Sequence, residues 1–335
     1  MNTPLLELRA VSKRFVKPLD FAARLGNVFG AVHREEVVHA VDGVSLAIAP
    51  GEVVGLVGES GCGKSTLGRM AVGLHTLSAG ERFLRGENIA ALQARLSHAE
   101  YRRQMLGIQM IFQDPYASLN PRLRVRDIVG EAPVAHGLIA RNEQDDYVAG
   151  LLSKVGLDAA FMRRYPHQFS GGQRARIGIA RALAVKPEFL VCDEAVAALD
   201  VSIQAQVLNL FIALRDELKL TYLFISHDLG VVRHLSDRVV IMYLGRVVES
   251  APADAVFAAP NHPYTQALLA EAPTLEVRKK TYVAIKGELP SPLAPPTGCH
   301  FHPRCPHAMQ RCKDEAPALR EIAAGWGSAC HLNDA

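Results

Sequence analysis

A glycine-rich loop between a predicted strand and a predicted helix constrains the fold of this 335-residue chain more than any other feature. The run EVVGLV at 52–57 is short and apolar, which favours a buried strand. The run LGRMAVGL at 67–74 carries its apolar residues at helical spacing. A strand, a loop and a helix in this order are typical of an α/β protein with a mostly parallel sheet.

The loop itself, GESGCGKST at 58–66, fits the phosphate-binding pattern G-x-x-x-x-G-K-S/T. Backbone N–H groups of such a loop point at phosphate oxygens, and the helix that follows presents the positive end of its dipole. We expect Lys64 to reach the β- and γ-phosphates of a nucleotide and the Ser65 hydroxyl to bind Mg²⁺. The predicted nucleotide-binding residues of the loop are Gly58, Glu59, Ser60, Gly61, Cys62, Gly63, Lys64, Ser65 and Thr66.

Two adjacent acids follow another apolar run at 189–192 and supply what a magnesium nucleotide site still needs. We expect Asp193 to hold Mg²⁺ through water and Glu194 to act as general base for the attacking water. A lone pair of acids often does no more than end a strand in solvent. The phosphate loop in the same chain favours the catalytic interpretation.

Further apolar runs predict strands at 108–112, 189–192, 221–226 and 238–243, and Val207, Phe211, Leu214 and Leu218 predict one face of a helix over 201–219. Residues 121–185 lack strand-like runs and are expected to form a helical lobe, while 17–36 read as a loop or insertion. After Pro260 the chain becomes Pro-rich and then Cys- and His-rich, with few apolar residues. No internal repeat is visible, which indicates one catalytic unit.

Composition excludes two classes of protein. The chain has 37 Lys and Arg against 34 Asp and Glu, without a basic block, which disfavours a dedicated nucleic-acid binder. Its longest apolar stretches, at 37–41 and 239–244, are far shorter than the about 20 residues that span a bilayer. The first residues do not resemble a secretory signal, so we expect a cytoplasmic protein.

Five more features, in their order along the chain, resemble the ATP-binding cassette (ABC) ATPases. Gln113 in IFQDP matches the Q-loop, FSGGQ at 169–173 the signature, Asp200 the D-loop and His227 in ISHDL the switch histidine. Phe15 is placed like the aromatic residue that stacks on adenine, although a core Phe is a fair rival there. A single Gln or His is more often structural than catalytic. It is the ordered set that carries the resemblance.

The resemblance implies a fold and a mechanism. The fold is an α/β P-loop NTPase, with a RecA-like mostly parallel sheet, an antiparallel β portion and a helical subdomain at about 121–185, all within residues 1–255. Two cassettes close head to tail, so that the signature and D-loop of one act on the nucleotide of the other. The implied roles are catalysis by Glu194, His227 and Gln113, Mg²⁺ binding by Ser65, Gln113 and Asp193, and action in trans by Ser170, Gly171, Gly172, Gln173 and Asp200. Ala195 and Ala197 depart from the family's usual Pro and Ser, which puts full activity in doubt.

The C-terminal extension, residues 256–335, resembles that of oligopeptide and dipeptide importer ATPases. The similar segments are HPYTQALL at 262–269, GELPSP at 287–292 and GCHFHPRCP at 298–306, together with AVDGVS at 40–45. The resemblance implies a second ATPase subunit, two membrane permeases and an extracytoplasmic peptide-binding protein as partners, no nucleic acid, and a place on the cytoplasmic face of the inner membrane. The alternatives are an importer of another solute such as a nickel chelate, or a soluble ABC ATPase that acts on ribosomes or DNA.

Four of the six cysteines, Cys299, Cys305, Cys312 and Cys330, lie in this extension. Four thiolates suit either Zn²⁺ or an iron–sulfur cluster, and no pair shows the short C-x2-C spacing of common zinc sites. Some members of the importer family have a 4Fe-4S cluster in such a tail, and this is our expectation. Zinc, with His300, His302 or His331 replacing a thiol, and unligated thiols are the alternatives. Cys62 and Cys192 are expected to be packing residues.

Overall fold

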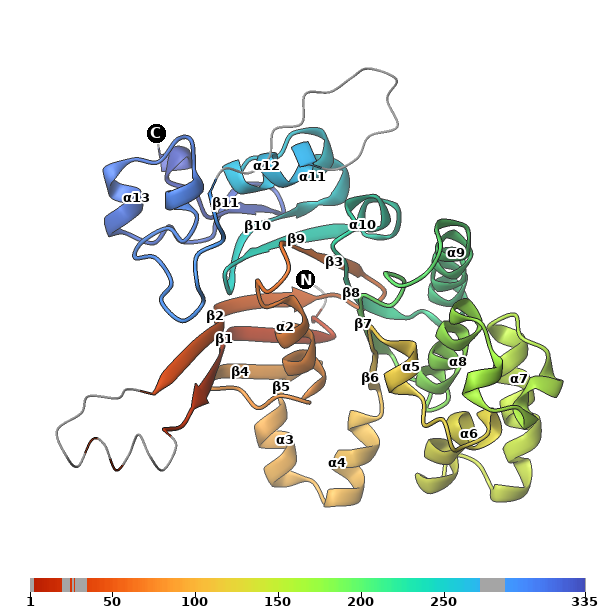
Figure 1. Ribbon diagram of the computed structural model, residues 1–335. Helices are drawn as coiled ribbons and strands as arrows, with labels where there is room; N and C mark the ends of the chain where they lie inside the picture. Colours follow the sequence, from red (N-terminus) through yellow and green to blue (C-terminus); the bar gives the residue numbers. More distant parts are fainter. Residues whose placement is uncertain (1–2, 20–24, 26, 28–34, 272–286, 335) are drawn as a thin grey trace.

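The computed structural model describes residues 3–19, 25, 27, 35–271 and 287–334, and its strands form two sheets (Figure 1). An antiparallel sheet has the strand order β2-β1-β4-β5, and a larger sheet the order β11-β12-β10-β9-β3-β8-β7-β6. Most of the predicted insertion at 17–36 lies outside the described residues. The two sheets match the expected cassette core and antiparallel portion.

The strands are β1 (Leu6–Lys17), β2 (Glu36–Ile48), β3 (Val53–Val57), β4 (Ala79–Leu84), β5 (Glu87–Asn88), β6 (Ile108–Ile111), β7 (Phe189–Asp193), β8 (Thr221–Ile225), β9 (Arg238–Tyr243), β10 (Arg246–Pro252), β11 (Arg320–Ala323) and β12 (Trp326–Ser328). The α-helices are α2 (Lys64–Val72), α3 (Ile89–Arg95), α4 (His98–Met105), α5 (Pro115–Ser118), α6 (Val125–Ala135), α7 (Gln144–Lys154), α8 (Gly171–Leu183), α9 (Val201–Leu218), α10 (Leu229–Leu235), α11 (Ala253–Ala258), α12 (Pro263–Glu271) and α13 (Gln310–Asp314). The 3-10 turns are η1 (Arg141–Glu143), η2 (Ala159–Arg163), η3 (Pro166–Gln168), η4 (His302–Arg304) and η5 (His331–Asp334).

The centre of the larger sheet is parallel. Strand β3 pairs with β8 and β9, and β7 pairs with β6 and β8, all in parallel register. Every residue of β3, β7 and β8 is buried, which is why these strands are continuous apolar runs. The predicted strands at 108–112, 189–192, 221–226 and 238–243 are confirmed. Their carboxyl ends lie along one edge, where the phosphate loop and the acid pair must meet.

Both faces of this sheet are covered, and alternation along the strands divides the side chains between two cores. One core holds Leu190, Cys192, Tyr222 and Phe224 and packs against the helical lobe and α9. The other holds Phe189, Val191, Leu223 and Ile225 and packs against α2 and the antiparallel sheet. Cys62 and Cys192 are buried in these cores, which confirms them as packing residues.

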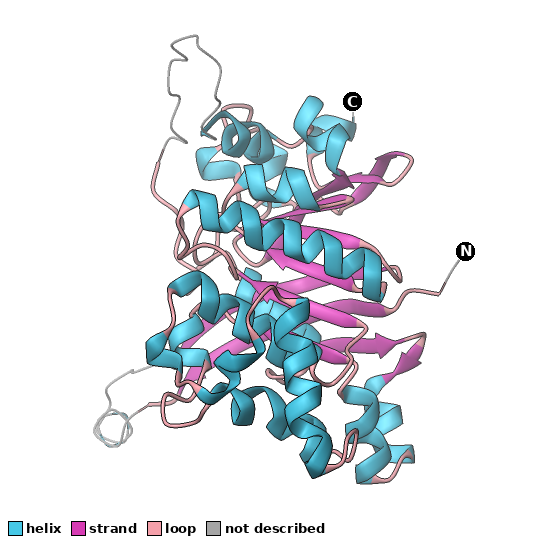
Figure 2. Cartoon of the chain, turned by 90° about the vertical axis from the view of Figure 1, so that its right-hand side faces the viewer, coloured by secondary structure: helices cyan, strands magenta, loops and turns pink. Residues whose placement is uncertain are grey.

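The helical lobe forms one side of the molecule, with α6, α7 and α8 packed together beside α9 (Figure 2). Residues 121–185 contain helices and 3-10 turns but no strand, as expected. The predicted helix at 201–219 is α9, and Val207, Phe211 and Leu214 are buried on its inner face. Leu218 is half exposed. No helix in the described ranges is long and apolar enough to cross a membrane.

The C-terminal extension continues the cassette rather than standing apart from it. Strand β12 pairs antiparallel with β10, so the extension lengthens the central sheet. The buried Glu249 of β10 accepts hydrogen bonds from the backbone N–H groups of Asn261 and His262 and from the Trp326 indole, each at 2.9 Å. These three charge-assisted bonds satisfy a carboxylate that burial would otherwise penalise.

Few apolar residues of the extension are buried in its described part, as expected, but two of them are large aromatic side chains. Tyr264 and Phe301 are fully buried and pack with Tyr243 of β9, at ring-centroid distances of 4.7 and 5.2 Å. Aromatic side chains bury large areas each, so two of them compensate for a tail that is otherwise polar.

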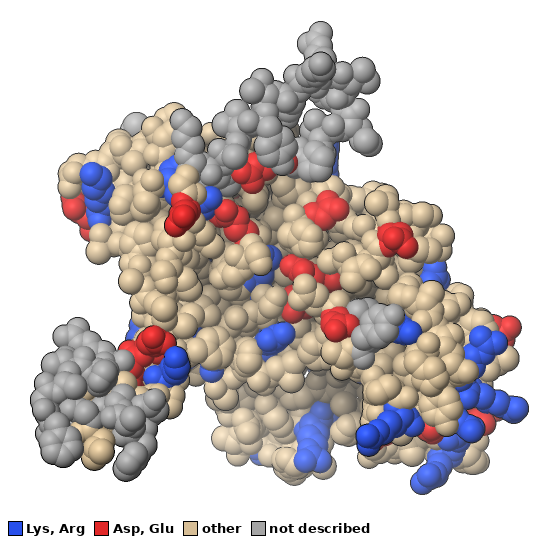
Figure 3. Space-filling model, viewed as in Figure 1, with Lys and Arg blue, Asp and Glu red and all other residues tan. Residues whose placement is uncertain are grey.

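Acidic and basic side chains are interspersed on the face drawn in Figure 3. Several Lys and Arg side chains lie over the helical lobe, at the lower right of that view. On this face the basic side chains are therefore most numerous over the helical lobe.

Candidate active site

The phosphate loop joins β3 to α2 and can be closed only by glycine at two positions. A Cβ on Gly58 would lie 2.2 Å from the carbonyl oxygen of Met242, and one on Gly63 would lie 2.1 Å from that of Ala40. Both glycines also have positive φ angles. The loop therefore wraps tightly against β2 and β9, and α2 begins at Lys64 with its N-terminus at the loop.

The Lys64 side chain is buried inside the loop. Its Nζ donates to the carbonyl oxygens of Gly58 and Glu59, at 2.7 and 2.9 Å. These bonds place the amine in the hollow of the loop, where it can transfer its hydrogen bonds to a phosphate oxygen.

Ser65 and Asp193 fit a magnesium site. The Ser65 hydroxyl donates to Asp193 Oδ1 at 2.7 Å, which joins the start of α2 to the carboxyl end of β7. Asp193 is 1% exposed, and burial raises the pKa of its carboxyl despite that hydrogen bond. A hydroxyl and a carboxylate at this distance are the hard oxygen donors that Mg²⁺ prefers. A bound cation would also offset the cost of the buried charge.

Glu194 lies between the two other predicted catalytic residues. Gln113 Nε2 donates to Glu194 Oε2 at 2.5 Å, and His227 Nδ1 lies 3.4 Å from Oε1. The Glu194 backbone has a φ of 47°, and its N–H donates to the Ile225 carbonyl at the end of β8. This left-handed turn costs conformational energy for a residue other than glycine, and it directs the carboxylate away from the strand.

A cavity of about 230 Å³ lies at this edge of the sheet. It is lined by Val38, Ala40, Ser60, Gly61, Gly63, Lys64, Ser65, Thr66, Gln113, Glu194 and Pro292. Most of the predicted loop residues thus surround one space with Gln113 and Glu194. Val38, Ala40 and Pro292 were not predicted. Ala40 and Pro292 belong to segments noted only for their resemblance to the importer family, and only the fold brings β2 and the Pro-rich segment here.

Phe15 does not line this cavity but pairs across β1 and β2 with Val38, which does. Directly opposite residues of an antiparallel pair share one face of the sheet. The Phe15 ring is 39% exposed and packs edge-on against His75 at 5.5 Å. It is therefore available at the surface beside the cavity and is not a core residue.

The signature residues lie at the start of α8 and do not line the cavity that contains Lys64. Ser170 caps the helix by accepting from the Gln173 N–H at 3.3 Å, and the Gln173 side chain accepts in return from the Ser170 N–H at 3.1 Å. A Cβ on Gly172 would lie 2.4 Å from a methyl group of Ile203, which fixes α8 close to α9. Ser170 is exposed, with the N-terminus of α8 behind it.

Asp200 and the two departures from the family pattern lie between β7 and α9. Asp200 is exposed and precedes α9 without capping it through its side chain. Ala195 is 5% exposed, whereas Ala197 is exposed. A change at Ala195 therefore acts on packing beside Glu194, and one at Ala197 acts on the surface.

The four cysteines of the extension gather in one neighbourhood. Burial raises the pKa of Cys299 to about 11, with smaller contributions from the other three thiols. The Cys299 N–H donates to the Cys312 carbonyl at 2.8 Å. However, no group of three or more His, Cys, Asp or Glu side chains in the described part of the chain could hold a metal ion. The thiols are gathered but not closed around a preformed site.

The three histidines proposed as alternative ligands are engaged elsewhere. His300 Nδ1 lies 3.0 Å from the Leu244 carbonyl, His302 Nδ1 2.9 Å from the Cys299 carbonyl, and His331 Nε2 3.0 Å from the Glu315 carbonyl. Both ring nitrogens of His331 are engaged, since its Nδ1 also lies 3.2 Å from Asp334 Oδ2, which disfavours His331 as a zinc ligand. His300 and His302 each use one ring nitrogen in these contacts, an arrangement that is also common in zinc-bound histidines.

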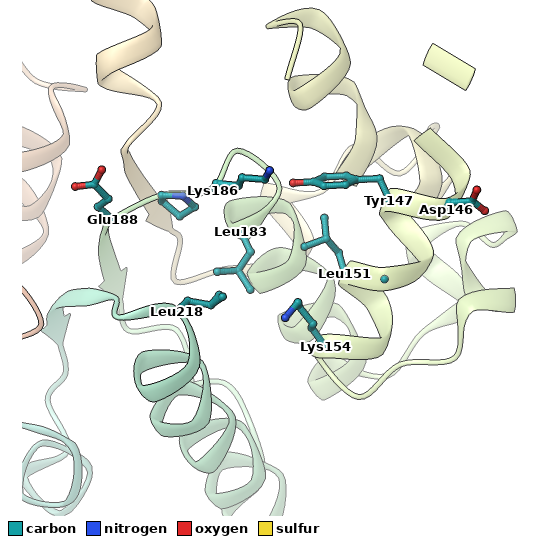
Figure 4. A pocket seen from close by; sticks show the side chains of 10 residues that line it. Asp146, Tyr147, Leu151, Lys154, Leu183, Lys186, Glu188 and Leu218 are labelled. Carbon is teal, nitrogen blue, oxygen red and sulfur yellow. The ribbon is translucent and has the colours of Figure 1, made fainter. Parts of the chain in front are cut away.

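A larger apolar cavity, of about 550 Å³, lies apart from this site (Figure 4). Tyr147, Leu151 and Lys154 of α7 line it together with Leu183 of α8 and Leu218 of α9. None of the predicted catalytic residues reaches it.

Comparison with known proteins identifies two family regions in the chain. Residues 41–197 match the ABC transporter family, and residues 248–312 match the C-terminal region of oligopeptide/dipeptide transporters. The oligopeptide transport ATP-binding protein AppF of Bacillus subtilis is 48% identical over 98% of this chain and 97% of its own length. The dipeptide transport ATP-binding protein DppF of Haemophilus influenzae is 44% identical over 98% of this chain and 97% of its own.

Among solved structures, the dimeric post-hydrolysis state of the ATP-binding cassette MJ0796, bound to ADP and Pi, is similar with a TM-score of 0.60 and 25% identity. The similarity covers 74% of this chain and 98% of that one. CbiO1 of Clostridium perfringens, part of the transporter complex cbiONQ, has a TM-score of 0.61 over 77% of this chain and 92% of its own.

Proposed function

Because the chain belongs to the family of ATP-binding subunits of oligopeptide and dipeptide ABC transporters, we propose that it hydrolyses ATP to power the import of di- and oligopeptides. The observation that carries this proposal is the meeting of Lys64, Ser65, Gln113 and Glu194 around one cavity in a chain that also has the peptide-transporter extension. A soluble ABC ATPase for ribosomes or DNA would have no need of that extension.

The phosphates of ATP are held by the loop and by the N-terminus of α2. Lys64 donates to the β- and γ-phosphates, and Ser65 and Asp193 hold Mg²⁺ with Gln113. When bound, Mg²⁺ would neutralise charge that develops on the phosphate oxygens. Phe15, at the surface beside the cavity, stacks on the adenine.

Hydrolysis depends on the group around Glu194. Its carboxylate accepts a proton from the attacking water, and the water oxygen bonds to the γ-phosphorus as the bond from that phosphorus to the β–γ bridging oxygen breaks and ADP leaves. His227 and Gln113, on either side of the carboxylate, orient the water and the γ-phosphate. The strained turn at Glu194 holds the base in place before nucleotide binds.

A second cassette completes the site. Ser170 and the backbone of Gly172 lie at a helix N-terminus, so they offer hydrogen bonds and a positive dipole end to the γ-phosphate bound by the partner. The exposure of Ser170, and the absence of both residues from the cavity of their own chain, support a role in trans. Gly171, Gln173 and Asp200 share this surface role.

The remaining partners follow from the family. Two permeases supply the membrane path, an extracytoplasmic binding protein delivers the peptide, and this chain binds the permeases at the cytoplasmic face of the membrane. The cargo class rests on the extension and on relatives named for oligopeptide and dipeptide transport. A nickel chelate or another small solute is the alternative cargo.

We further propose that Cys299, Cys305, Cys312 and Cys330 hold a 4Fe-4S cluster. The proposal is supported by the number and kind of donors and by their common neighbourhood, not by a preformed geometry. Protein purified without oxygen is expected to contain iron and sulfide and to absorb broadly in the visible range. The Cys330→Ser variant is expected to lose the iron, the sulfide and the absorption. Zinc without iron would establish the alternative metal, and neither would leave the thiols unligated.

Peptide uptake tests the main proposal. In cells that lack the chromosomal copy, the wild-type chain is expected to restore uptake of a labelled dipeptide or oligopeptide. Lys64→Ala is expected to weaken ATP binding roughly 10- to 100-fold, because it removes hydrogen bonds to charged phosphates, and so to abolish uptake. Lys154→Ala, which removes an exposed lysine of α7, is the control and should restore uptake. Uptake of a nickel chelate but no peptide would reassign the cargo, and equal uptake with Lys64→Ala would reject an ATP-driven role.

A further inference from the structure

We propose that the C-terminal extension controls the phosphate loop through Arg304, which neutralises and positions Glu59, the loop's one acidic side chain. The inference rests on the proposed role of the loop in ATP binding. It assigns to the extension a direct effect on nucleotide affinity, in addition to any contact with partner subunits.

The ion pair joins parts of the chain that are 245 residues apart. Arg304 donates from both terminal nitrogens to the two carboxylate oxygens of Glu59, at 2.7 and 3.0 Å. The Arg304 side chain is only 5% exposed and that of Glu59 25%. A two-pronged pair with one buried partner has a fixed geometry and is little screened by salt, unlike the exposed pairs elsewhere in the extension.

Arg304 is itself held by the core that joins the extension to the cassette. It ends the turn η4, where its N–H donates to the carbonyl of the buried Phe301 at 3.0 Å. Its guanidinium also lies 3.4 Å from the hydroxyl of Tyr243. The arginine is therefore positioned by Phe301 and Tyr243 before it meets the loop.

A second contact reaches the same loop residue. The Glu59 backbone N–H donates to the Tyr264 hydroxyl at 2.9 Å, and Tyr264 is fully buried at the start of α12. The extension thus holds both the backbone and the side chain of Glu59. A third contact joins the extension to β2 and not to Glu59. The carbonyl of Pro292, which lines the nucleotide cavity, accepts a hydrogen bond from the His39 N–H at 3.0 Å.

The charge of Glu59 makes these contacts consequential. Its neighbours Gly58 and Ser60 lie in the loop that surrounds the phosphates. A Glu59 carboxylate without a partner would therefore repel the negatively charged phosphates at short range. Arg304 cancels that charge, and its pull on the side chain keeps the carboxylate on the extension side of the loop. Among the described residues, the ion pair of this carboxylate is with Arg304 of the extension and not with a cation of the cassette.

The test is the affinity of the purified full-length chain for ATP, measured by titration with a fluorescent ATP analogue and competition by ATP. Arg304→Gln is expected to raise the Kd about tenfold, because the Glu59 carboxylate is left uncompensated beside the phosphates. Arg320→Gln is the matched control. It removes an exposed arginine of the same extension that pairs with Asp334, and it should change the Kd by less than about twofold.

Adding Glu59→Gln to the Arg304→Gln variant separates charge from packing. The double variant lacks the same guanidinium but no longer carries the carboxylate, and it is expected to recover about fivefold of the lost affinity. The same substitution in the wild-type background has a smaller effect, because Arg304 already neutralises the charge. Should R304Q unfold, Arg304→Lys keeps the positive charge and is expected to bind ATP within about threefold of the wild type.

Wild-type affinity in folded R304Q would overturn the inference, and so would a double variant that binds no better than R304Q. Both results leave the proposed function intact as long as the wild type binds ATP and Lys64→Ala does not. A wild-type chain that binds no ATP would overturn the proposed function and this inference with it.

Discussion

Replacement of Glu194 by glutamine is expected to slow hydrolysis of the ATP bound by this chain about 10²- to 10⁴-fold while ATP binding persists. The amide keeps the shape of the side chain but cannot accept the proton of the attacking water. Binding persists because the groups that hold the phosphates, Lys64 and Ser65, lie on the loop and α2 and make no hydrogen bond to Glu194. The geometry around residue 194 also survives, since Gln113 can donate to an amide oxygen as it does to the carboxylate.

Hydrolysis is best measured in the assembled transporter, with binding measured on the purified chain. Glu188→Gln is the matched control, because Glu188 precedes β7 at the opposite end of the strand and forms an exposed ion pair with Arg85. It should hydrolyse ATP at close to the wild-type rate. Hydrolysis by E194Q at a rate close to that of E188Q would remove Glu194 from the role of base and leave His227 as the candidate.

The phosphate loop and the acid pair could be predicted because their geometry is local. The strand β3, the loop and α2 are consecutive, so the pattern at 58–66 and its flanking runs describe the whole motif. Asp193 and Ile225 end parallel neighbouring strands, and this register brings Glu194 and His227 to one edge of the sheet. Apolar runs were enough to predict both strands.

The contacts of the extension could not be predicted in this way. Arg304 and Glu59 each look like a solvated charge in the sequence, and nothing in their neighbours indicates that they pair across 245 residues. Strand β12 is a three-residue strand that contains Gly327, which is too short for a periodic pattern. Long-range pairing and short edge strands depend on the whole fold, and one sequence does not reveal them.

The cysteines show a different limit. Their count and their clustering predict that they gather, and they do. Whether four thiols can bind a metal or a cluster depends on the distances between them, which the sequence does not carry. The engagement of His300, His302 and His331 with backbone carbonyls is likewise visible only in three dimensions.

Substitution of Ser170 in the signature is a second change that is expected to impair ATP hydrolysis but not ATP binding. Ser170→Arg should leave the affinity of the same chain for ATP within about twofold of the wild type, since exposed substitutions far from a site have small effects. In the assembled transporter it should lower hydrolysis of the ATP bound by the partner cassette about 10²- to 10³-fold, the usual cost of a lost hydrogen-bond donor to developing charge. The long side chain would also obstruct the surface that meets the partner's nucleotide.

The matched control is Ser153→Arg, which places the same side chain on an exposed serine of α7 in the same lobe. Thermal melting separates an effect on the interface from the loss of the helix cap, which costs about 1 kcal/mol at such positions. Loss of ATP binding in a folded S170R chain would show that the signature acts on the nucleotide of its own chain. Full hydrolysis by S170R would show that the cassettes do not close head to tail over this residue.

Because E194Q disables the nucleotide bound by its own chain and S170R the one bound by its partner, a transporter that carries both changes in this chain alone should lose hydrolysis at both sites.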